Sequence, residues 1–119
     1  MKSESRRQQK MASLLQETLS LILPEELRPF TASLVTITRV EVQGDLRAAR
    51  VLLSVFGPAS PEDVRTHLTK RTGAIRHRLA SQVEFKYNPG LFFVLDPSAE
   101  AVERIERIIA ETQHDDETG

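Results

Sequence analysis

Two short runs of β-branched and aliphatic residues, separated by one turn, constrain the fold of this chain more than any other feature. Residues 33–42 and 46–56 are rich in Val, Ile, Thr and Leu, which favour β-strands. Between them, Gln43–Asp45 has the composition of a tight turn, in which we expect Gly44 to supply a positive φ. Because the connection is so short, the strands are expected to pair antiparallel as a hairpin.

A helix is predicted ahead of this hairpin. Apolar residues recur at helical spacing over residues 4–22, and either Ser3 or Ser5 is placed to cap the start. Because proline cannot continue a helix, we expect Pro24 and Pro29 to mark the exit from it.

A second helix is predicted after the hairpin. Ser60 followed by Pro61 and two acids is typical of a helix start, and the apolar pattern continues to about Ser81. Gly73 lies inside this helix, where a glycine costs about 1 kcal/mol relative to alanine. We therefore expect Gly73 to mark a kink or a close approach of another backbone. The face predicted to be buried holds Val64, Leu68, Ile75 and Leu79.

The remaining segments complete a small α+β domain. Residues 83–87 and 91–95 are predicted strands, interrupted at Asn88–Gly90, and Asp96–Ser98 opens a last helix. We expect one domain over residues 1–112, with a three-stranded sheet, helices on one face and a C-terminal helix. The acidic tail, residues 113–119, is predicted to be disordered.

Composition narrows the class of protein. The chain has 119 residues, no cysteine and a net charge of −1. We expect neither disulfides nor a secretory signal nor a membrane span, and a cytoplasmic location. The small net charge conceals an uneven distribution of charge along the chain. Six bases and one acid lie within residues 64–87, whereas residues 96–119 hold eight acids and two bases.

Catalysis is not expected from the motifs. His67 and His77 lie ten residues apart on one predicted helix, which does not place them together as metal ligands. No phosphate-binding loop or nucleophile motif is present, and the carboxylates fall mostly on predicted helix ends and the tail. We expect no enzyme activity, metal, cofactor or small-molecule substrate.

The basic stretch around Gly73 predicts an RNA-binding surface. A helix break there would expose backbone N–H groups among cationic side chains, an arrangement that favours phosphate. The alternatives are a solvated helix face, an adaptor that presents its acidic tail to a basic partner, and a general binder of single-stranded RNA. The candidate contacts are Arg65, Lys70, Arg71, Gly73, Arg76 and Arg78, with Lys86, Arg39, Arg6 and Arg7 as further members.

The chain resembles the ribosome-binding factor A family over nearly its whole length. The resemblance lies in the order and spacing of several short motifs, with Arg6-Arg7 ahead of the first helix. These motifs are Thr38–Val42 with Asp45-Leu46 and Ala49; Val55 and Gly57; Gly73–Arg76 with Leu79-Ala80; and Pro89–Leu91 leading to Phe93 and Asp96.

This resemblance implies a KH-like domain of the type II order. The family has an Ala-x-Gly kink between two helices; here the glycine is Gly73 and Arg71 replaces the alanine. Gly90 stands where the family usually has Glu. The resemblance further implies a protein, monomeric when free, that binds the free small (30S) ribosomal subunit. It would assist late maturation of 16S rRNA, including its 5′ end, without cutting RNA.

Overall fold

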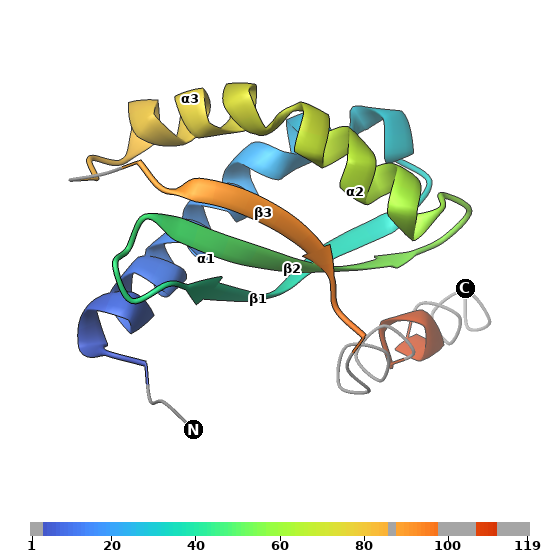
Figure 1. Cartoon of the computed structure of the whole chain (residues 1–119). Coiled ribbons are helices and arrows are strands. Elements are labelled where there is room, and N and C mark those ends of the chain that lie inside the picture. The colour runs from blue at the N-terminus through green and yellow to red at the C-terminus, as the bar shows by residue number, and fades with distance from the viewer. Residues whose placement is uncertain (1–3, 86–87, 98–106, 112–119) are drawn as a thin grey trace.

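The computed structural model describes residues 4–85, 88–97 and 107–111. In chain order a helix is followed by two strands, then by two helices and a third strand (Figure 1). They are helix α1 (Arg6–Glu26), a 3-10 turn η1 (Arg28–Phe30), strands β1 (Leu34–Val42) and β2 (Ala48–Phe56), helices α2 (Pro61–Lys70) and α3 (Thr72–Gln82), and strand β3 (Gly90–Leu95). Residues 107–111 are also helical; the rest of the predicted last helix and the acidic tail lie outside the described residues.

The predicted hairpin is confirmed. Strands β1 and β2 pair antiparallel, from Leu34 opposite Phe56 to Val42 opposite Ala49, with a bulge between Ile37 and Arg39. The prediction for the turn is wrong in one respect, because the positive φ of 62° belongs to Leu46 and not to Gly44. The Leu46 side chain packs against the core, and its N–H donates to the carbonyl of Gln43 at 2.9 Å, which together hold this backbone conformation.

The third strand joins the other side of β2. Strand β3 runs parallel to β2, with Gly90 opposite Ala48 and Leu95 opposite Leu53, so the sheet has the order β1-β2-β3. The predicted strand over residues 83–87 is wrong for residues 83–85, which form no strand; Lys86 and Tyr87 lie outside the described residues. Hydrogen bonds to Arg76 tie Asn88 and Pro89 to α3, and the chain enters the sheet only at Gly90.

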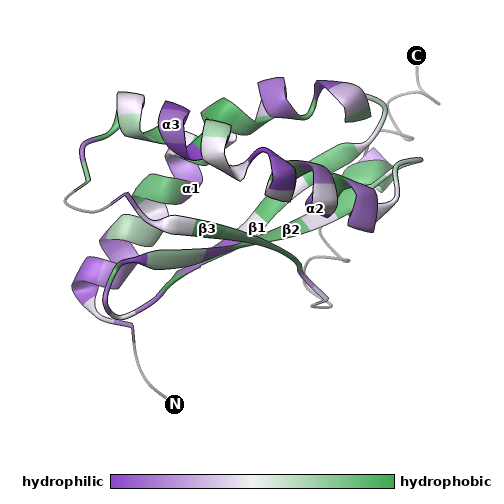
Figure 2. Ribbon diagram, turned by 45° about the horizontal axis from the view of Figure 1, so that its top comes forward, coloured by the Kyte–Doolittle hydropathy of each residue, from purple (hydrophilic) through white to green (hydrophobic). Residues whose placement is uncertain are grey.

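Helices α1, α2 and α3 cover one face of the sheet, as predicted. The buried core consists of alternate residues of the strands and of one apolar stripe on each helix. Figure 2 shows that hydrophilic and hydrophobic residues alternate along α2 and α3. The predicted stripe Val64, Leu68, Ile75 and Leu79 is fully buried. The broken helix pair therefore turns its other face outward, above β2 and β3 (Figure 1).

Helix α1 starts as expected but ends later. Ser5 caps it in a capping box with Gln8, whose side chain also donates to the carbonyl of Val42 at 2.8 Å. The predicted exit at Pro24 is wrong, since the helix passes through this proline and ends at Glu26. In the turn after the proline, the N–H of Leu27 donates to the carbonyl of Leu23 at 2.9 Å. Contacts of Glu26 with His67 on α2 and with Arg71 hold this turn in place.

Candidate nucleic-acid interface

The break between α2 and α3 lies at Arg71, two residues before Gly73. Arg71 leaves the helical conformation with φ −95° and ψ 6°, and the Thr72 hydroxyl donates to the carbonyl of Thr69 at 2.8 Å. A Cβ added to Gly73 would meet nothing within 4 Å, and its φ is not positive. Of the two alternatives expected at Gly73, the break is present, two residues earlier, and the close approach of another backbone is not.

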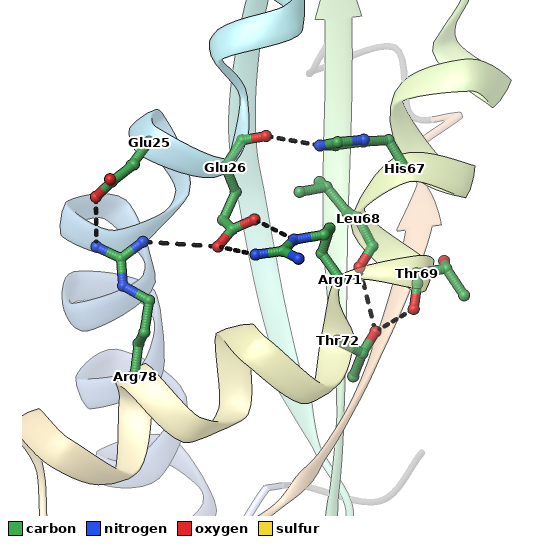
Figure 3. A network of polar contacts seen from close by, with 8 residues as sticks. All are labelled: Glu25, Glu26, His67, Leu68, Thr69, Arg71, Thr72 and Arg78. Carbon is green, nitrogen blue, oxygen red and sulfur yellow. Dashed lines mark hydrogen bonds and ion pairs between the residues drawn. The ribbon is translucent and has the colours of Figure 1, made fainter.

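One buried carboxylate organises this break. The side chain of Glu26, only 7% exposed, points from the last turn of α1 toward Arg71 at the break and Arg78 on α3 (Figure 3). It accepts from Arg71 Nε at 2.8 Å and lies 3.6 Å from Nη1 of Arg78 on α3. The main-chain oxygen of Glu26 lies 2.7 Å from Nε2 of His67 on α2. A single residue thus contacts α2, the break and α3.

The surrounding charges perturb this carboxyl. The hydrogen bond from Arg71 lowers the pKa of Glu26, burial opposes that effect, and the positive charges of Arg71 and Arg78 add to the lowering. The same hydrogen bond raises the pKa of Arg71. Glu26 lies at a helix end, as most carboxylates were expected to, and its pKa is lowered by two cations that are far from it in the sequence.

An open groove lies between the end of α1 and α3. Arg71 and Arg78 line it with their side chains 51% and 34% exposed, so both guanidinium groups reach its surface. Glu25 on the groove edge accepts from Arg78 at 2.9 Å and is 55% exposed. The lining residues are Glu25, Glu26, Arg28, Arg71, Ala74, His77 and Arg78.

Two other predicted arginines are already engaged by the protein. Arg65 on α2 pairs with Glu62 through Nε at 3.0 Å and Nη2 at 2.9 Å. Arg76 is half-buried and donates to the main-chain oxygens of Pro89 at 2.9 Å and Asn88 at 2.7 Å. Arg76 therefore holds the entry to β3, whereas Arg65 remains at the surface within a local ion pair.

The remaining candidates do not form one patch. Lys70, the last residue of α2, is exposed and makes no ion pair with any residue that the structure describes. Arg6 and Arg7 are exposed at the start of α1, about 30 Å along this 21-residue helix from Glu26. Arg39 on β1 pairs with Glu41 at 3.3 Å on the sheet face opposite the helices, and Lys86 lies outside the described residues.

Sequence reasoning missed Glu25, Glu26, Arg28 and His77 as neighbours of the basic stretch. A signal for Glu26 was present, because Leu15, Leu19, Ile22 and Glu26 continue one helical stripe, all of it buried. Ending the helix at residue 22 concealed this signal. Within the described ranges, no three His, Cys, Asp or Glu side chains could hold a metal ion, and no helix is long and apolar enough to cross a membrane.

The element order and the mixed sheet, with the broken helix pair α2–α3, define a KH-like domain of the type II order. The family model for ribosome-binding factor A matches residues 7–109. A ribosome-binding factor A from Coxiella burnetii (strain RSA 493 / Nine Mile phase I) is 36% identical over 105 residues, which cover 88% of each chain. The chain therefore belongs to the ribosome-binding factor A family.

Solved structures show the same fold. The crystal structure of ribosome-binding factor A from Thermus thermophilus matches with a TM-score of 0.60 at 19% identity, covering 74% of this chain and 94% of that one. A Thermus thermophilus ribosome-binding factor A, fitted as a homology model into a cryo-EM map of a 30S complex, matches with a TM-score of 0.53 at 23% identity. That match covers 68% of this chain and 90% of the other.

Proposed function

We propose that this protein binds the free small ribosomal subunit and assists late maturation of its 16S rRNA, including the 5′ end, without cutting RNA. Family membership supports the first part, because a related protein of the same fold is described in a 30S complex. We further expect the protein to be monomeric when free and to act in the cytoplasm.

The observation that carries the proposal is the group of cations at the helix break. Lys70 and Arg71 lie at the junction, and Arg78 faces the same groove as Arg71. Such a surface attracts the RNA backbone with an affinity that depends on salt. The break also leaves the first turn of α3 without a side-chain cap, so its amides remain available to phosphate oxygens.

The test is co-sedimentation with separated ribosomal subunits at moderate salt. We expect the protein to sediment with the small subunit and not with the large one. Lys70→Gln should weaken binding about threefold and reduce the salt slope by about one, because it removes one exposed charge without breaking an ion pair. Lys10→Gln makes the same chemical change on α1, far from the break and one turn from Arg6. It should bind like the wild type if the break is the contact, and an equal loss would place the contact at the start of α1 as well.

Two other functions predict different outcomes. A general binder of single-stranded RNA would be displaced equally by unrelated RNA and by small subunits. An adaptor that uses its acidic tail would lose its partner when residues 113–119 are deleted, whereas a subunit binder would not. Protein that stays unbound, or that prefers the large subunit, would contradict the proposal.

A further inference from the structure

Glu25 and Glu26 are adjacent in sequence and both contact Arg78, yet their surroundings differ. The Glu26 side chain is 7% exposed and that of Glu25 is 55% exposed. Glu26 lies between the guanidinium group of Arg71 at the break and that of Arg78 on α3, as Figure 3 shows, whereas the exposed Glu25 contacts Arg78. The two carboxylates are therefore suited to different roles toward the same arginine.

We propose that Glu26 is a positioning residue for RNA binding, which holds Arg71 and Arg78 side by side so that both point into the groove and bind the phosphates of one RNA strand. This inference rests on the proposed function, because it assumes that the groove faces rRNA. It adds the ligand chemistry of the groove and the residue that arranges it.

The contacts of Arg71 leave it able to bind a phosphate. Its Nε and one Nη2 hydrogen face Glu26, at 2.8 and 3.4 Å, so the guanidinium keeps further donors on its exposed edge. A free arginine loses side-chain freedom when it binds, which weakens the interaction. Because Glu26 already fixes Arg71, much of that loss occurs when the protein folds and not when RNA binds.

Glu26 also holds Arg78, but Glu25 competes with RNA for the same guanidinium group. Its Nη1 lies 3.6 Å from the buried Glu26, while its Nη2 donates to the exposed Glu25 at 2.9 Å. An RNA phosphate that approaches from solvent would replace Glu25 and leave Glu26 in place. Glu25 therefore opposes binding, whereas Glu26 supports it despite carrying the same negative charge.

The two glutamates form a matched pair for the experiment. Glu25→Gln and Glu26→Gln each remove one negative charge from neighbouring positions, so simple electrostatics predicts tighter RNA binding for both. Positioning predicts opposite signs. We expect Glu26→Gln to weaken small-subunit binding about fivefold, and Glu25→Gln to bind as tightly as the wild type or more tightly.

Salt dependence separates positioning from a loss of folded protein. A variant that is only partly folded has fewer active molecules but the same slope of log affinity against log salt concentration. If Glu26→Gln loses one positioned arginine contact, its slope should fall by about one, whereas Glu25→Gln should keep the slope of the wild type. Circular dichroism and urea unfolding verify the folded fraction of each variant.

The outcomes are distinct. If Glu26→Gln binds as tightly as Glu25→Gln, with an unchanged slope, the positioning role is overturned while the proposed function stands. If the wild type itself does not bind the small subunit, both are overturned. If Glu26→Gln does not fold, Glu26→Asp is measured instead; its carboxylate is one methylene further from both arginines, and wild-type affinity for that variant would overturn the role.

Discussion

Arg76 and Asn88 are hydrogen-bonded to each other in both directions. The guanidinium of Arg76 donates to the main-chain oxygen of Asn88 at 2.7 Å, and the side-chain amide of Asn88 donates to the main-chain oxygen of Arg76 at 3.1 Å. A second bond from Arg76 reaches Pro89 at 2.9 Å. One basic residue of the predicted RNA-binding stretch thus fastens the segment that leads into β3.

This pairing predicts that Arg76 acts mainly on stability. Arg76→Met should lower the free energy of unfolding by about 2 kcal/mol, because two carbonyls lose a charged donor. Arg65→Met makes the same substitution in an exposed pair and should cost less than about 0.5 kcal/mol. Urea unfolding followed by circular dichroism measures both. If the two variants are equally stable, the prediction is wrong and Arg76 contributes no more to stability than the surface residue Arg65.

The perturbed carboxyl predicts a pH dependence. Because the pKa of Glu26 is lower in the folded protein than its ordinary value of 4.5, ionised Glu26 contributes stability above that value. This contribution disappears as the pH falls through the folded pKa. At pH 7 Glu26→Gln should be less stable than the wild type by about 2 kcal/mol, and the difference should shrink as the pH is lowered below 4.5. Urea unfolding over that range tests this, and a constant difference would contradict it.

The open space at Gly73 predicts that this glycine is dispensable for the break. Gly73→Ala should raise the free energy of unfolding by up to about 1 kcal/mol, because alanine is the better helix former and its methyl group meets no atom. Gly57→Ala should instead destabilise the protein, since Gly57 has a φ of 125° and an added Cβ would lie 2.8 Å from the Cα of Ser33. Thermal unfolding compares the two, and loss of structure in Gly73→Ala would show that the break needs glycine.

The buried face of α2 predicts a large effect of core truncation. Leu68 is fully buried, and Leu68→Ala should lower the free energy of unfolding by about 3 kcal/mol. Leu21→Ala removes the same atoms from a side chain that is 72% exposed, and should change stability by less than about 0.5 kcal/mol. Similar losses in both variants, measured by urea unfolding, would contradict the assignment of the core face.

Local signals were sufficient for much of the fold. Ser5 and Pro61 mark real helix starts, and the short turn after Val42 specifies a hairpin, because capping and turn chemistry act within a few residues. The continuation of α1 through Pro24 could not be predicted in this way, because contacts of Glu26 with residues more than forty positions away stabilise it.

The candidate site was predictable in place but not in arrangement. Gly73 and the positive charges at residues 70–78 indicated a helix break surrounded by cations, and the structure has its break at Arg71. The partners of Arg71, Arg76 and Arg78 come from α1 and the segment before β3, so composition could not separate groove-lining arginines from those that hold the fold.

The parallel pairing of β3 with β2 has a consequence for the order in which the chain acquires its structure. The hairpin of β1 and β2 needs only neighbouring residues, whereas Gly90 must meet Ala48 after α2 and α3 have crossed over the sheet. During synthesis β3 also emerges after the other elements of the sheet. We therefore expect β3 to pair with β2 late in folding, after Arg76 has reached its position on α3. Until then, the hairpin and α1 form an intermediate in which one edge of β2 is unpaired.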